Sequence, residues 1–133
     1  MCLSLAIDRP DDVLAHKEHL GFEFMIMCNG LGFRCGYIRI SKDHPWHSKN
    51  YNEIDVNIHG GLTFAEHDKS CDKHGKDDAY WIGFDCAHAF DAPDPLLLKK
   101  NSFKMPSFHG DIVRTQEYVE RECRSLCYQA SQI

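Results

Sequence analysis

The chain has 133 residues, of which 43% are hydrophobic and 26% charged, and its formal net charge is −5 at pH 7. These values predict one globular domain over residues 1–133 and exclude a disordered or fibrous chain. The acidic balance argues against duplex nucleic acid and against an anionic membrane surface as partners.

Signals for targeting and for disulfide bonding are absent from the sequence. No apolar run approaches the roughly 18 residues of a membrane-spanning helix, and residues 1–12 lack the basic start and the apolar stretch of a secretion signal. We therefore expect a cytoplasmic protein with no membrane partner. The seven cysteines form no Cys-x-x-Cys pair, which favours reduced, mostly buried thiols over a disulfide framework.

The first third of the chain predicts a helix followed by a hairpin. Pro10, the two aspartates after it and Gly21 are helix start and stop signals, so a short helix is expected near residues 10–20. The apolar run 22–28 and the run 33–40 flank the sequence Asn-Gly-Leu-Gly. This arrangement is typical of two antiparallel strands.

The middle of the chain predicts further strands. The apolar residues Ile54, Val56 and Ile58 alternate with polar ones, which indicates a strand. Two glycines interrupt the pattern, which resumes over residues 62–65, and such a pair suggests a bulge. Polar residues 66–78 predict an exposed loop, and residues 80–86 predict another strand.

The end of the chain predicts an irregular segment over residues 92–111 and a long helix from about 112 to 131. One face of this helix is marked at i, i+4, i+7 and i+11 by Val119, Cys123, Leu126 and Ala130. Together the elements predict an α+β fold in a single domain. We expect a mostly antiparallel sheet of four to five strands with the long C-terminal helix packed on it.

Asp85, His88 and Asp91 are the densest group of residues suited to chemistry. They follow a predicted strand at a spacing of three, so a helical turn there would bring them to one face. One histidine with two carboxylates suits a divalent metal. It equally suits a base whose tautomer an aspartate holds. The structural alternative is that the aspartates cap turns and the histidine satisfies a buried backbone group.

A second group is the sequence His-Gly-Gly-Leu-Thr at residues 59–63. Paired glycines let backbone N–H groups approach an anionic ligand, and His59 and Thr63 add an imidazole and a hydroxyl. An ordinary glycine bulge is the alternative. Because neighbouring strands could join this group to the first, the two together predict a site.

Two further histidine patterns have spacings found in metal sites. The pattern His-x-x-His at residues 44–47 contains Pro45, which disfavours a helix there. The pattern His-x3-Cys-x2-His at residues 67–74 is compatible with zinc, although it lacks a second cysteine pair. Separately, Cys86 could form a thiolate–imidazole pair with His88, with a buried inert thiol as the alternative.

Several motifs occur in a fixed order along the chain. They are Arg-Cys-Gly-Tyr at 34–37, His-Pro at 44–45, His-Gly-Gly-Leu-Thr-Phe at 59–64 and Gly-Phe-Asp-Cys-Ala-His at 83–88. Over about residues 22–130 the sequence resembles a family of small bacteriophage and bacterial proteins with this pattern. The resemblance implies one intact domain, a phage or bacterial source and the cytoplasm of the bacterial host. It implies no particular reaction.

The positions that this resemblance carries over are those of the two groups above: His59, Gly60, Gly61, Thr63, Asp85, Cys86, His88 and Asp91. The sequence departs from the pattern at two places. Phe33 stands where a histidine often occurs and removes one potential ligand. Phe90 stands where a glycine often precedes the aspartate, which makes the turn before Asp91 less free.

The leading hypothesis is a small metal-dependent hydrolase acting on a phosphorylated or nucleotide-like substrate. The candidate catalytic residues, which are also the candidate ligands of a divalent ion such as zinc, are His59, Asp85, His88 and Asp91. The candidate ligand-binding residues are Gly60, Gly61, Thr63 and Trp81. The alternatives are a non-catalytic phage accessory protein that sequesters a small ligand or a host protein, and a thiol enzyme that uses Cys86 and His88.

Overall fold

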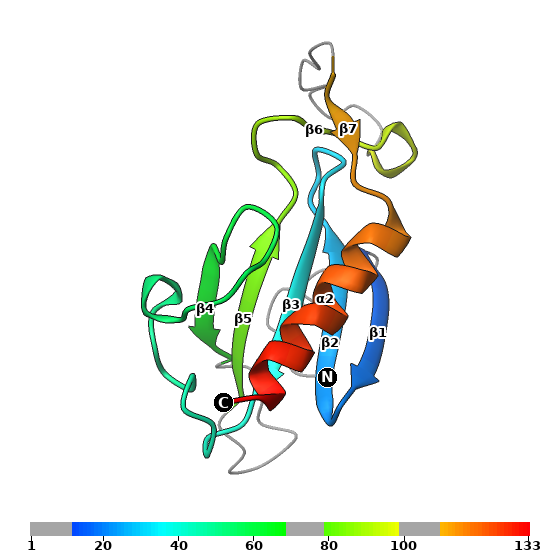
Figure 1. Ribbon diagram of the computed structural model, residues 1–133. Helices are drawn as coiled ribbons and strands as arrows, with labels where there is room; N and C mark the ends of the chain where they lie inside the picture. The colour runs from blue at the N-terminus through cyan, green and yellow to red at the C-terminus, as the bar shows by residue number, and fades with distance from the viewer. Residues whose placement is uncertain (1–11, 69–78, 99–109) are drawn as a thin grey trace.

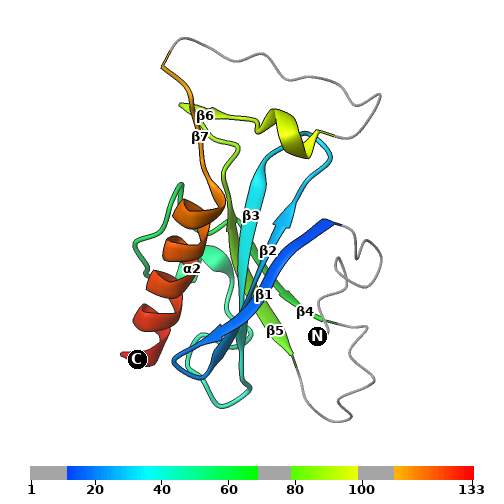
Figure 2. The same cartoon turned by 90° about the vertical axis from the view of Figure 1, so that its right-hand side faces the viewer.

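A five-stranded antiparallel sheet, in the order β1-β2-β3-β5-β4, forms the centre of the protein (Figure 1). The computed structural model describes residues 12–68, 79–98 and 110–133. Its strands are β1 Val13–His19, β2 Phe22–Cys28, β3 Arg34–Ile40, β4 Phe64–His67 and β5 Tyr80–Asp85. Helix α2, Gln116–Ser131, covers one face of the sheet (Figure 2). The predicted α+β fold, with four to five strands and a C-terminal helix, is confirmed.

Smaller elements lie in the connections. A short parallel pair is formed by β6, Asp91–Ala92, and β7, Ile112–Val113, and it lies beyond one end of the main sheet (Figure 1). Single 3-10 turns occur at Tyr51–Glu53 and Pro95–Leu97. In the described ranges no helix is long and apolar enough to cross a membrane.

The turn between β2 and β3 has the chemistry that its sequence predicted. The side-chain oxygen of Asn29 accepts hydrogen bonds from the backbone N–H groups of Leu31, at 2.9 Å, and Phe33, at 3.1 Å. Gly32 has a left-handed φ of 90°, which glycine adopts at little cost. The predicted antiparallel hairpin is therefore confirmed.

The helix predicted near residues 10–20 is wrong, because residues 13–19 form the edge strand β1. Leu20 and Gly21 have φ angles of 53° and 84°, and the residues flanking them, His19 and Phe22, are paired across the two strands. Gly21 thus completes a two-residue hairpin turn instead of ending a helix. Local start and stop signals were outweighed by pairing with β2.

The strand predicted at residues 54–58 is also wrong. Ile54 and Ile58 are buried in the core between sheet and helix, but the segment pairs with no strand among the described residues. Instead the backbone N–H of Asn57 donates to the side chain of Gln129 on α2, at 2.9 Å. The alternating pattern reflects packing along the helix, and β4 begins only at Phe64.

The core between the sheet and α2 confirms the predicted apolar face of the helix. Its members alternate along β2, β3 and β5 and include Phe24, Ile26, Ile38, Ile40, Ile82, Phe84, Val119, Cys123, Leu126, Cys127 and Ala130. A side chain at Gly36 would come within 2.6 Å of the Phe84 ring and 2.7 Å of Cys123 Sγ. The glycine therefore permits the close approach of helix and sheet. The predicted start of the helix at about residue 112 is wrong, because residues 112–113 form a short strand. The helix begins at Gln116, where the Thr115 side chain caps it by accepting from the N–H of Tyr118.

The opposite face of the sheet carries a second buried cluster, made of Met25, Met27, Cys35, Tyr37, Ala79 and Trp81. Parts of the predicted loops lie outside the described residues, namely 69–78 and 99–109. The first of these ranges contains Cys71 and His74 of the pattern at residues 67–74.

Candidate functional site

Asp91 lies at the centre of the polar network beyond the end of β5. Its side chain is fully buried and accepts hydrogen bonds from three donors. These are Nε2 of His59 at 2.9 Å, Nε of Arg114 at 2.7 Å and the backbone N–H of His88 at 3.0 Å. The loop after β5, the segment before α2 and the segment after residue 58 thus meet at one carboxylate.

These donors determine the charge of the Asp91 side chain. Burial by itself raises the pKa of a carboxyl, but the hydrogen bonds from His59, Arg114 and the His88 backbone outweigh it and lower the pKa of Asp91 below its ordinary value. The same contact raises the pKa of Arg114. The two side chains therefore form an ion pair in the folded protein.

Both ring nitrogens of His59 are occupied. Nδ1 lies 2.8 Å from the hydroxyl of Tyr118, and Nε2 faces Asp91. Because a carboxylate only accepts, Nε2 of the neutral ring carries the proton and Nδ1 accepts from Tyr118. The backbone N–H of His59 donates to Glu122 at 3.0 Å, so this residue joins helix α2 to the loop after β5.

His88 has a different environment, next to Asp85. Its Nε2 lies 3.2 Å from Oδ1 of Asp85, and its side chain is 35% exposed. Asp85 is itself held by the hydroxyl of Thr63, at 2.9 Å, and by the N–H of Ala87, at 3.0 Å. Although it lies this close to Asp85, Nε2 of His88 is buried and forms no hydrogen bond in the described part of the chain.

Gly60 provides the surface on which the His88 ring lies. A Cβ atom at Gly60 would stand 2.3 Å from Cδ2 and 2.4 Å from Nε2 of His88. Gly60 and Gly61 both have left-handed φ angles, 68° and 77°. The glycine pair thus serves the packing of an imidazole as well as the turn.

A cleft of about 530 Å³ adjoins the His88 and Asp85 side chains. Its wall combines polar groups at one end with aromatic rings and a thiol, and the lining residues are Asn29, Cys35, Tyr37, Thr63, Phe64, Phe84, Asp85, Ala87 and His88. Among the described residues that line it, none is lysine or arginine. The described lining thus combines one carboxylate and one imidazole with aromatic rings.

The structure brings the four predicted catalytic residues together as two pairs. The ring centroids of His59 and His88 are 6.1 Å apart, with Asp91 bound to the first ring and Asp85 facing the second. In the described ranges, no group of three or more His, Cys, Asp or Glu side chains is arranged to hold a metal ion.

Most of the predicted ligand-binding residues do not line the cleft. The N–H of Gly61 donates to the carbonyl of Ile58, and the Thr63 hydroxyl donates to Asp85. Both donors thus have acceptors inside the protein. Trp81 is fully buried in the cluster on the second face of the sheet and does not line the cleft. Thr63 alone of the predicted ligand-binding residues does so.

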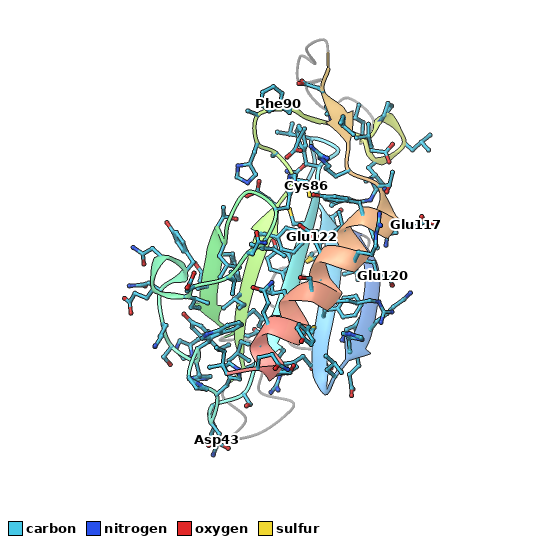
Figure 3. The ribbon with its side chains drawn as sticks, viewed as in Figure 1. Asp43, Cys86, Phe90, Glu117, Glu120 and Glu122 are labelled. Atoms are coloured by element: carbon cyan, nitrogen blue, oxygen red, sulfur yellow. The ribbon has the colours of Figure 1, made fainter. Side chains whose placement is uncertain are left out.

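Three residues of the site were not predicted from the sequence, namely Arg114, Tyr118 and Glu122. Tyr118 and Glu122 are one turn apart on α2, beside the apolar face, and Arg114 stacks over the Tyr118 ring at 5.2 Å. This i, i+4 polar pair was a usable signal. Figure 3 shows Glu122 on the side of α2 that faces the loops, and Phe90 at the outer end of the loop after β5.

Phe90 and Cys86 have clear local environments. Phe90 has a φ of 73° and is 70% exposed, so it occupies the left-handed conformation that a glycine adopts more easily.

Cys86 belongs to the core under α2, and burial raises the pKa of its thiol to about 12. Such a thiol is almost entirely protonated near neutral pH, which disfavours a nucleophilic role.

Arg34 binds within the protein and not at the cleft. Its guanidinium donates to the carbonyl of Arg114 at 3.0 Å and to the side chain of Gln116 at 3.2 Å, and it lies 3.0 Å from Asp94. The start of β3 is thereby tied to the N-terminal end of α2.

The fold and site define an α+β domain with a histidine–carboxylate site at one end of an antiparallel sheet. No family model, curated protein or solved structure matches the chain. Its function is therefore inferred from the geometry of the site.

Proposed function

We propose that this protein is a small hydrolase in which His88 is the general base and Asp85 orients its ring. The observation that carries the proposal is the 3.2 Å approach of Asp85 Oδ1 to His88 Nε2, next to the cleft. Nε2 is buried and has no hydrogen-bond partner in the described part of the chain, so the negative charge of the nearby Asp85 favours the tautomer with the proton on that atom. Nδ1 is then unprotonated and able to accept a proton from water or from a substrate hydroxyl.

The surrounding residues supply the rigidity that such a base requires. Thr63 and Ala87 hold Asp85, Gly60 supports the His88 ring, and Asp91 binds the backbone N–H of His88. A base held in this way loses little freedom when a substrate binds. In this proposal His59 and Asp91 position the loop that carries His88, and they do not contact the substrate.

The substrate class follows from the lining of the cleft. The aromatic rings of Tyr37 and Phe64, whose centroids are 5.1 Å apart, suit an apolar or planar group. The Asp85 carboxylate, with no cation among the described lining residues, favours a neutral or cationic ligand over a phosphorylated one. We therefore propose a small ester or amide as the substrate.

A metal-dependent form of the hydrolase, with a divalent ion on His59, Asp85, His88 and Asp91, is less well supported. Both nitrogens of His59 and both oxygens of Asp91 already have hydrogen-bond partners inside the protein. An ion at that place would have to displace those bonds, including the ion pair of Asp91 with Arg114. The acid–base form requires no such rearrangement.

The test is a hydrolysis screen with p-nitrophenyl acetate, neutral amides and phosphoesters, run on the wild-type chain and on His88→Ala. We expect turnover of a neutral ester or amide that falls about 10²- to 10⁴-fold in His88→Ala, the range of a lost general base. Asp85→Asn should lower kcat with little change in KM, because the amide no longer selects the tautomer. His16→Ala, an exposed histidine on β1, is the matched control and should retain full activity.

Two arms of the screen separate the alternatives. Activity that disappears with a chelator and returns with zinc would favour the metal-dependent form. The absence of turnover in a folded wild-type protein, or equal rates in wild type and His88→Ala, would overturn the hydrolase proposal. Stoichiometric ligand binding without turnover would then assign the cleft to sequestration of a small molecule.

A further inference from the structure

A second histidine cluster lies at the other end of the β4–β5 pair from the cleft. His67 ends β4 and is paired with Tyr80, the first residue of β5, whereas Asp85 is at the far end of that strand. His47 comes from the loop after β3. The ring centroids of His47 and His67 are 5.2 Å apart, and both rings pack on Tyr80, at 5.2 and 4.7 Å.

One atom of each ring faces the same point. The hydroxyl oxygen of Ser48 lies 2.9 Å from Nδ1 of His47 and 3.2 Å from Nε2 of His67. Ser48 has a left-handed φ of 67°, a conformation that costs a non-glycine residue energy. Two imidazole nitrogens from separate segments therefore converge on a small polar group at an exposed surface.

Tyr80 is buried and forms the aromatic wall on which both histidine rings pack. Glu66 directly precedes His67 on β4, so a negative charge lies next to it in the chain. The Tyr80 hydroxyl donates to the carbonyl of Lys49, which holds this aromatic wall in place.

We propose that His47 and His67 form the protein part of a binding site for a divalent transition ion, with Zn²⁺ as the test ion. Imidazole nitrogen is a preferred ligand of zinc, nickel and copper. The ion would take the place of the Ser48 hydroxyl between Nδ1 of His47 and Nε2 of His67, and water would complete its coordination. This site is separate from the cleft and does not depend on the proposed hydrolase activity.

The site also explains two sequence patterns that the cleft leaves unused. His47 comes from the pattern at residues 44–47 and His67 from the pattern at residues 67–74. The fold joins one histidine from each. The other histidine of the first pattern, His44, is engaged elsewhere, since its Nε2 lies 2.8 Å from the carbonyl of Ala130 at the end of α2.

Zinc titration by calorimetry on the full reduced chain tests the proposal. We expect one ion per chain at this site, with affinity at least about tenfold weaker in His47→Ala and in His67→Ala, since even the loss of a group that only supports a ligand typically costs about 10- to 100-fold. Ser48→Ala keeps both nitrogens and removes the competing hydroxyl, so it should bind zinc at least as tightly as wild type. His16→Ala and His88→Ala are the controls and should bind as wild type does.

A second readout protects the test against variants that fail to fold. Trace Cu²⁺ added to the wild-type protein should broaden the imidazole NMR signals of His47 and His67 before those of His16, His59 and His88. Acidification should abolish the effect, because protons compete for the ring nitrogens. Absence of zinc binding by wild type, unchanged affinity in both His47→Ala and His67→Ala, or copper broadening confined to other histidines would overturn the proposal.

Discussion

The carboxylate of Asp91 accepts a hydrogen bond from the backbone N–H of His88 at 3.0 Å. The same carboxylate binds His59 and Arg114. The position of the proposed base thus depends on a buried residue that does not line the cleft. This arrangement separates the residues that hold the site from those that would act on a ligand.

Loss of the Asp91 side chain is expected to be the most destabilising change at the site. Asp91→Ala leaves Arg114 without its carboxylate. Because Arg114 is 20% exposed, the cost should lie at or below the about 3–5 kcal/mol of breaking a fully buried pair. Urea unfolding measures the change. Asp85→Ala, which removes a carboxylate that is 31% exposed, is the control and should cost clearly less. Equal losses of stability in the two variants would contradict the central role of Asp91 in holding the site together.

The free energy of unfolding should depend on pH in a way that reflects the lowered pKa of Asp91. Its pKa is lower in the folded protein than its ordinary value, so the folded state binds fewer protons there than the unfolded state. The contribution is complete above the ordinary aspartate pKa and is lost as the pH falls through the lowered one. Asp91→Asn should therefore flatten the acid limb of the stability curve. An acid limb unchanged by this substitution would show that other carboxyls cause it.

Alanine at Gly60 and at Gly61 should have different effects. Both positions have left-handed φ angles, so each substitution should cost about 1–2 kcal/mol of backbone strain. At Gly60 the new Cβ also meets the His88 ring, whereas at Gly61 nothing lies within 4 Å. Gly60→Ala should thus lose about 1–3 kcal/mol more through overpacking, and it alone should shift the His88 NMR signals. Identical behaviour of the two variants would refute the proposed support of His88 by Gly60.

The cysteines buried between α2 and the sheet should resist alkylation while the protein is folded. Burial raises the pKa of Cys86 and of Cys127 to about 12, and it raises the pKa of Cys123 as well. With iodoacetamide near neutral pH, peptide mass spectrometry should find all three unmodified, and modified after addition of urea. Rapid modification of Cys86 in the native protein, with loss of activity, would favour the alternative hypothesis of a thiol enzyme.

Elements with a strong local signal could be predicted from the sequence. The Asn-Gly turn defines the hairpin of β2 and β3, and the apolar spacing from Val119 to Ala130 defines the buried face of α2. Strand β1 could not be predicted, because Gly21 serves equally well to end a helix or to form a turn. Pairing with β2 decides between them. The segment 54–58 has strand periodicity, but its neighbour is a helix.

The residues that belong to the site could be predicted from the sequence better than the contacts between them. The spacing of Asp85, His88 and Asp91 indicated that they would gather, and they do so with His59. Which carboxylate faces which imidazole depends on the distance between β5 and α2, which no local pattern contains. Arg114 was missed because it lies in a segment predicted to be the first turn of the long helix, and its partner is 23 positions away in the chain.

Because of the β6–β7 pair, the described fold does not depend on an unbroken chain between residues 98 and 110. Asp91 and Ala92 pair with Ile112 and Val113, and Asp91 binds Arg114 while Arg34 binds the Arg114 carbonyl. The stretch between residues 98 and 110 is thus bracketed by contacts that do not need the peptide bonds inside it. A single cleavage there would leave two fragments that remain associated as one folded unit.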